Sequence, residues 1–172
     1  MQSENEIINR VAASSLKVFD LEEYYVQGER VLLDIKDQLY QGLILKEKDF
    51  RDFVKSNDWS AYKDKLVAIT CSEDAIIPTW AYMLLASALE PFAHTAVFGT
   101  LPHLEEKIFY DALSRIEWQQ FKDARVVIKG CSKVQVPITA YIEATRLMRP
   151  YAASIMFGEP CSTVPVFKKP RL

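Results

Sequence analysis

The sequence predicts an α/β fold with three layers, in which a mainly parallel sheet lies between helices. Residues 45–99 align without gaps onto residues 104–158, and identical residues recur throughout, which indicates a tandem internal duplication. Each repeat has the pattern helix, strand, helix, strand. Four strands separated by helices favour parallel pairing through right-handed crossovers, so both observations point to the same fold class.

Each repeat begins with an amphipathic helix and continues into a β-branched strand. Apolar side chains recur at helical spacing over Leu45–Ser56 and Leu104–Arg115. The short apolar runs Leu66–Thr70 and Arg125–Lys129 then have the composition of strands that are buried on both faces. We therefore expect these two runs to be inner strands of the sheet.

A second helix and a second strand close each repeat. Pro78 and Pro137 mark the helix starts, because the fixed φ and missing N–H of proline suit a first helical turn. The helices are expected to run to about Glu90 and Arg149, since a proline follows each of these residues. The closing strands are predicted at Thr95–Phe98 and Ser154–Phe157.

Residues 1–44 lie outside the duplication. Within them, Arg30–Lys36 and Gln41–Leu45 predict an N-terminal β-hairpin at an edge of the sheet. The tail, residues 159–172, contains Val164–Phe167, which is expected to be one more extended segment. These parts complete a single predicted α/β domain.

Size, charge and composition narrow the functional class. A length of 172 residues suits one domain. A net charge of −2 and a pI near 5.8 argue against nucleic-acid partners held by phosphate neutralisation. The longest uncharged run, Ala75–Leu89, is too short for a membrane span, and residues 1–15 do not resemble a signal peptide. Three widely spaced cysteines form no disulfide framework, so we expect a cytoplasmic location.

The cysteines follow the predicted strands. Cys71 and Cys131 come directly after one strand of each repeat, and Cys161 lies just beyond the last strand. Parallel strands end at the same edge of a sheet, so we expect the three thiols to converge there. Thiolates suit zinc or an iron–sulfur cluster. Cys161 aligns with Pro102, so the neighbouring His103 is a candidate fourth ligand. The carboxylates Glu73, Asp74 and Glu159, expected at the same edge, are the alternatives.

These residues favour a non-hydrolytic accessory protein that holds a metal or an iron–sulfur species. Two alternatives for the cysteines remain open. Buried free cysteines often act as small hydrophobes, and no C-x-x-C pair is present. A thiol nucleophile paired with His94 or His103 is the second alternative.

One predicted helix carries no charge. Trp80–Leu89 is apolar on all sides, whereas the matched Ile138–Arg149 carries Glu143 and two arginines. A helix of this kind needs cover on every face. Either residues 1–44 supply that cover, or the helix forms a homodimer interface. The second functional hypothesis is therefore a scaffold or interaction module, with cysteines that are only structural.

Three segments resemble a bacterial family known as domain of unknown function 2480. They are Gly42–Arg51, Pro78–Ala86 and Phe157–Pro165. The resemblance extends over nearly the whole chain. It implies no activity, substrate or catalytic residue. It does imply iron–sulfur assembly proteins as partners, which agrees with the cysteine hypothesis.

Overall fold

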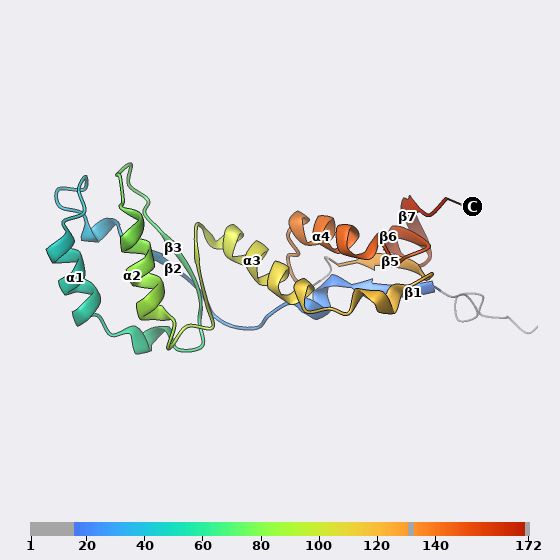
Figure 1. The fold of residues 1–172 in the computed structure, drawn as a ribbon, viewed down its shortest axis with the longest axis horizontal. Helices are drawn as coiled ribbons and strands as arrows, with labels where there is room; N and C mark the ends of the chain where they lie inside the picture. Colours follow the sequence, from blue (N-terminus) through green and yellow to red (C-terminus); the bar gives the residue numbers. More distant parts are fainter. Residues whose placement is uncertain (1–15, 131–132, 171–172) are drawn as a thin grey trace, which may run out of the picture. The chain divides into compact units, whose positions relative to one another are not determined.

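The computed structural model describes residues 16–130 and 133–170, and these residues form two compact units. Unit 2 is the continuous segment Val26–Phe109, and unit 1 combines residues up to Tyr25 with those from Tyr110 onward. Figure 1 labels the helices and strands of both units. Each unit has its own sheet, one parallel and one mixed, so the predicted α/β class is confirmed.

Unit 2 contains a parallel sheet of three strands. The order is β2 (Arg30–Asp34), β3 (Leu66–Thr70) and β4 (Thr95–Phe98), with β3 in the centre. The helices α1 (Glu47–Ser56) and α2 (Thr79–Leu89) connect these strands. The first four residues of β3 are buried, as its uninterrupted apolar run predicts.

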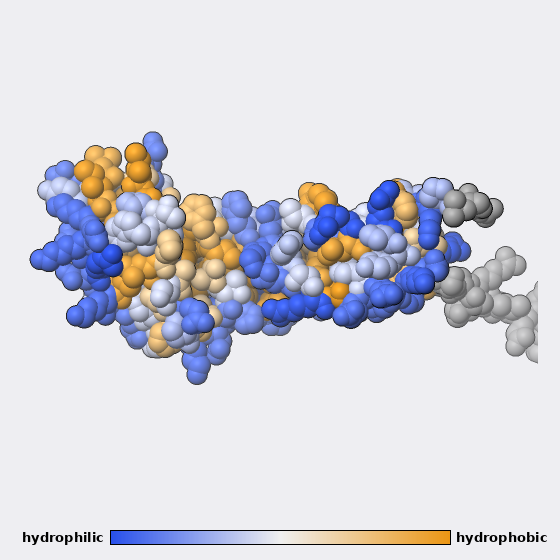
Figure 2. Space-filling view, in the orientation of Figure 1, coloured by the Kyte–Doolittle hydropathy of each residue, from blue (hydrophilic) through white to orange (hydrophobic). Residues whose placement is uncertain are grey.

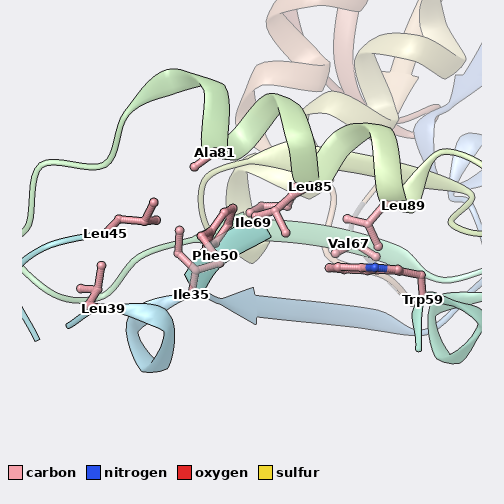
Figure 3. Packing of buried hydrophobic residues seen from close by; sticks show 10 residues of the cluster. All are labelled: Ile35, Leu39, Leu45, Phe50, Trp59, Val67, Ile69, Ala81, Leu85 and Leu89. Atoms are coloured by element: carbon pink, nitrogen blue, oxygen red, sulfur yellow. The ribbon is translucent and has the colours of Figure 1, made fainter. Parts of the chain in front are cut away.

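The main core of unit 2 lies between one face of the sheet and helices α1 and α2. Figure 3 shows Leu85 and Leu89 of α2 directed toward Val67 and Ile69 of β3. Successive residues of a strand point to opposite faces, so Leu66 and Ala68 lie on the other face. There they pack with Leu104 and Ile108 of α3 (Leu101–Ser114). Helices therefore cover both faces of this sheet.

Unit 1 contains a mixed sheet of four strands. Its order is β1 (Leu16–Asp20), β5 (Arg125–Lys129), β6 (Ser154–Glu159) and β7 (Ser162–Lys168). The first three strands are parallel, and β7 returns antiparallel to β6 with a β-bulge between Ile155 and Met156. The tail was predicted to be extended, and β7 confirms this.

The core of unit 1 combines an aromatic cluster with the helix α4 (Ile138–Met148). The ring of Phe19 lies 5.1 to 5.5 Å from the rings of Tyr24, Trp118 and Phe121. Small residues of α4 and its last residue are also buried: Ala140, Ala144 and Met148. Small side chains at these positions let the helix backbone approach the sheet closely.

The two units share an order of elements. A one-turn 3-10 helix, a strand, an α-helix and a second strand follow one another in both, with matching lengths for β3 and β5 and for α2 and α4. Asp64 and Asp123, just before the first strand of each pair, adopt positive φ angles of 60° and 56°. Their N–H groups donate to the carbonyl oxygens of Phe92 and Tyr151, both at 2.9 Å.

The prediction that both repeats contribute to one sheet is wrong. Residues before the first repeat supply one strand to each unit: β2 pairs in parallel with β3, and β1 pairs in parallel with β5. Each repeat therefore completes a sheet of its own with a strand from outside the repeat. That the whole chain is one domain stays a prediction.

The predicted N-terminal hairpin is also wrong. Residues 30–34 form β2, which pairs with β3, and residues 41–45 form no strand. A single antiparallel bridge joins Tyr40 to Ile44 across a tight turn, in which Gln41 and Gly42 have φ angles of 52° and 70°. Of the two predicted hairpin strands, only the first is a strand, over Arg30–Asp34, and it pairs with β3 instead of with residues 41–45.

We predict that Gly99→Ala destabilises unit 2 by roughly 2 kcal/mol. Gly99 has a φ of 131°, and a Cβ atom there would lie 2.9 Å from three atoms of His103. Thermal and urea unfolding would measure the change. Gly42→Ala is the matched control, because Gly42 also has a positive φ but a Cβ atom there would meet nothing within 4 Å. Equal losses in both variants would contradict the steric explanation.

Candidate functional site

The carboxyl ends of β2 and β3 are held together by an aspartate. Asp34 accepts hydrogen bonds from the backbone N–H groups of Lys36 at 3.0 Å and Ser72 at 3.1 Å. Burial favours the neutral carboxyl, but the hydrogen bonds from the Ser72 side chain and from both backbone groups outweigh it. They hold the pKa of Asp34 below its ordinary value. Asp34 is therefore an ionised structural clamp at this edge.

Cys71 lies at the same edge, as the sequence predicts. Its thiol is partly buried, and its Sγ lies 3.7 Å from the carbonyl oxygen of Glu73. Burial, followed by the nearby charges of Cys71 and Asp34, raises the pKa of Tyr82. The Tyr82 ring packs edge-on against Phe98, with centroids 4.9 Å apart. Cys71 also packs against the apolar core of unit 2.

The corresponding edge of unit 1 is built from different residues. Lys129 Nζ pairs with Asp20 Oδ2 at 3.0 Å, and this hydrogen-bonded partner raises the pKa of Lys129. Gly130 takes the place of Cys71, and Tyr141 donates its hydroxyl to the Gly130 carbonyl oxygen at 2.6 Å. A Cβ at Gly130 would lie 3.1 Å from that hydroxyl oxygen, so this position favours glycine.

Beside this edge, unit 1 contains an apolar cavity of about 410 Å³ between α4 and the strands β6 and β7. Its walls include Ile128, Val136, Met156 and Phe157. Thr145 is a polar wall residue, but its hydroxyl donates to the Tyr141 carbonyl oxygen at 2.7 Å. The polar wall groups are thus engaged within the protein, and the cavity suits an apolar guest.

Exposed apolar side chains form what we call the apolar surface of unit 1, and three of them, Ile138, Phe157 and Val166, line the cavity. This surface consists of Ile138, Ile142, Phe157, Val164 and Val166. Ile138 is 78% exposed and Ile142 63% exposed, which is unusual for isoleucine on a monomeric surface. Figure 2 shows apolar residues at the surface over the first turns of α4.

The uncharged helix α2 is mostly covered. Ala81, Leu85 and Leu89 are buried, and Trp80 packs edge-on against Phe50 of α1 at 5.9 Å. From the described part of residues 1–44, Leu33, Ile35 and Leu39 belong to the same core, in agreement with the expectation that this segment covers the helix. Among the large apolar side chains of α2, Met83 is highly exposed, at 67%.

The proposed role in holding a metal or an iron–sulfur species is wrong. Within residues 16–130 and 133–170, no group of three or more His, Cys, Asp or Glu side chains could hold a metal ion. Cys71 belongs to unit 2, whereas Cys161 belongs to unit 1 and is exposed at the turn between β6 and β7. Cys131 lies outside the described residues. The thiols were expected to meet at the edge of one sheet, but the described strands form two separate sheets.

His103 is engaged at the start of α3. Its Nδ1 accepts the backbone N–H of Thr100 at 3.1 Å and lies 2.9 Å from the Thr100 hydroxyl. This arrangement caps the first turn of the helix. The histidine proposed as a fourth ligand therefore has a structural task within unit 2.

The model of the family described as protein of unknown function (DUF2480) matches residues 5–169. The chain belongs to this family. The DUF2480 assignment agrees with the resemblance found in the sequence. No curated protein and no solved structure matches this DUF2480 chain. Over the described ranges, none of its helices has the length and apolarity needed to cross a membrane.

Sequence reasoning missed the apolar surface of this DUF2480 protein. It compared the total charge of two helices and assigned the interface to the uncharged one. The available signal was the i, i+4 spacing of Ile138 and Ile142 on a helix whose buried face already consists of Ala140, Ala144 and Met148. Isoleucines outside the buried stripe have to be exposed.

We predict that Asp34→Asn lowers the thermal midpoint at pH 7 and has little effect at a pH near 2. A carboxyl whose pKa is depressed on folding stabilises the fold above its unfolded value of about 4, and this contribution is lost as the pH falls through the folded value. Melting curves of both proteins across this pH range would measure the difference. The control is Asp37→Asn on the adjacent turn. A difference that persists unchanged at low pH would contradict the clamp.

Proposed function

We propose that this protein is an interaction module that assembles as a homodimer through the apolar surface of unit 1. The observation that carries the proposal is the group of exposed apolar side chains around an apolar cavity, with Ile138 and Ile142 the most exposed of them. Contiguous apolar patches on soluble domains commonly mark interaction sites. The homodimer predicted from the sequence is thus retained, but on α4 instead of α2.

A second copy of the chain is the partner that this surface fits. In a two-fold interface the same patch meets itself, so an uncharged centre faces an uncharged centre. Next to Ile142, Glu143 and Arg146 form an ion pair at 2.6 Å. The hydrogen bond from Arg146 lowers the pKa of Glu143, which keeps the pair charged. Opposite charges beside a two-fold axis allow each glutamate to face the arginine of the other copy.

The cavity accounts for the specificity of the proposed interface, because it can take one side chain of the second copy. The guest we propose is the Ile138 side chain of the second copy, since the cavity has apolar walls and is large enough for such a group. A buried aliphatic anchor in a pocket is a common source of affinity, and the surrounding exposed residues would exclude water from it.

We also infer that the two units descend from one duplicated segment. The shared order of elements and the paired positive-φ aspartates support this. At the positions equivalent to Ile138 and Ile142, unit 2 has Thr79 and Met83. In this reading, one copy of the segment acquired the interface after duplication.

The cytoplasmic location stays a prediction. The iron–sulfur assembly partners were inferred together with the metal site and are not proposed here.

The proposal predicts a dimer that Ile142→Glu dissociates. Burying a glutamate against its own copy in a two-fold interface is unfavourable, so we expect the dimer dissociation constant to rise at least about tenfold. Sedimentation equilibrium over a range of protein concentrations would measure it. Ile142 is largely exposed, and an unchanged circular dichroism spectrum would confirm that the variant folds.

Met83→Glu is the matched control, because Met83 is the equivalent residue on α2 and is similarly exposed. It should leave the dimer intact. A wild-type protein that is monomeric at all concentrations would overturn the homodimer. A dimer that Met83→Glu dissociates and Ile142→Glu does not would place the interface on α2 and reject the one proposed.

A further inference from the structure

A row of polar and cationic residues crosses three strands of unit 1 at the amino-terminal edge of β6. Ser154 is the register partner of Arg125 on β5 and of Lys168 on β7. Register partners on neighbouring strands point to the same face, with Cβ atoms about 5 Å apart. The Ser154 side chain therefore lies between two cations on one face of the sheet.

These residues line a cavity of about 570 Å³. Next along the strands, Met156 pairs with Pro165, and both line the cavity together with Phe167. Two residues of a strand span about 7 Å, so the apolar part of the cavity begins about 7 Å from the cationic row. A small ligand can therefore reach both parts. The cavity is polar and positive at one end and apolar at the other.

The positive charge of this cavity is not balanced by its own walls. Arg125, Lys168 and Lys169 line it, and no carboxylate residue is among the lining residues that the structure describes. Lys169 has a distant partner, Asp123, at 3.8 Å, and both side chains are more than half exposed.

Unit 2 provides an internal comparison. In the equivalent row there, Leu66 pairs with Thr95 on one side and with Arg30 on the other. Arg30 is neutralised by Glu105, whose Oε1 lies 2.7 Å from the Arg30 Nε. Leu66 is fully buried and packs with Leu104 and Ile108 of α3. At the same position of the repeat, unit 1 has Arg125, which is exposed. In unit 1, the cation Arg125 therefore occupies the position at which unit 2 has Leu66 packed against a helix.

We propose that this cavity binds a small amphiphilic anion, with a carboxylate or phosphate head and an apolar body. The head accepts hydrogen bonds from the Arg125 guanidinium, the Lys168 ammonium and the Ser154 hydroxyl. Charge-assisted bonds of this kind are the strong ones, and a guanidinium can bind such a head in a bidentate manner. The apolar body lies along Met156 and Pro165. The ligand is a monomeric molecule in solution.

This inference does not depend on the homodimer. Of the residues named for the two sites, only Met156 lines both cavities. Substitutions at Arg125 or Lys168 leave the apolar surface of unit 1 intact, and Ile142→Glu leaves the cationic row intact. Failure of one proposal is thus distinguishable from failure of the other.

The test is a titration of the ¹⁵N-labelled full-length protein with octanoate, followed by NMR. We expect saturable shifts of the backbone amides of Arg125, Ser154 and Lys168. Arg125→Gln and Lys168→Gln should each weaken octanoate binding about tenfold, because each removes one charge from the row. Lys48→Gln, which removes an exposed charge from α1 of unit 2, should change the affinity less than twofold.

Two further probes separate the head from the body. Acetate lacks the body and 1-octanol lacks the charge, so both should bind at least about tenfold more weakly than octanoate at this row. Octanol binding as tight as that of octanoate, or octanoate affinity unchanged in both glutamine variants, would overturn the proposal. Binding to phosphatidylglycerol vesicles without saturable octanoate shifts would also reject it in favour of a membrane surface.

Discussion

In both units, a tryptophan at the start of a one-turn 3-10 helix joins an α-helix to the strand that follows. The indole N–H of Trp59 donates to the carbonyl oxygen of Val54 at 2.7 Å, and that of Trp118 donates to Leu113 at 3.1 Å. Both residues are 8% exposed, so the rings also fill the space between helix and sheet. Without the indole, a partly buried carbonyl would lose its partner at a cost of roughly 1–3 kcal/mol. The indole therefore fixes where the inner strand, β3 or β5, begins relative to the end of the preceding helix.

The local composition of the sequence was sufficient to predict much of the secondary structure. The runs Leu66–Thr70 and Arg125–Lys129 are strands with the predicted bounds, because β-branched residues without interruption have few alternatives to a buried strand. Pairing could not be read in the same way. Leu16–Asp20, which was not predicted as a strand, pairs with Arg125–Lys129 more than one hundred residues away, and no local pattern specifies such a partner. The cysteine hypothesis failed for the same reason, because it depended on which strands share a sheet.

The choice between helices shows a different limit of sequence patterns. A charge count describes a helix as a whole, whereas exposure is decided face by face. The Trp80 side chain is apolar but is covered by Phe50 and by the guanidinium of Arg51, whose carbon lies 5.2 Å from the Trp80 ring centroid. On α4, the charges of Glu143 and Arg146 lie beside an exposed Ile142. If the buried face of each helix had been known, the interface would have been assigned to α4 instead of α2.

The separation between β1 and β5 has a consequence for the order in which the chain folds. Unit 2 is complete in sequence at Phe109, and its strands pair over shorter distances along the chain. Leu16–Asp20 has no strand partner until residues 125–129 have been synthesised. Domains fold as units during synthesis, and distant pairings form slowly. Unit 2 is therefore expected to fold first. Until residues 125–129 are available, β1 of unit 1 remains an unpaired strand with which other nascent chains can pair.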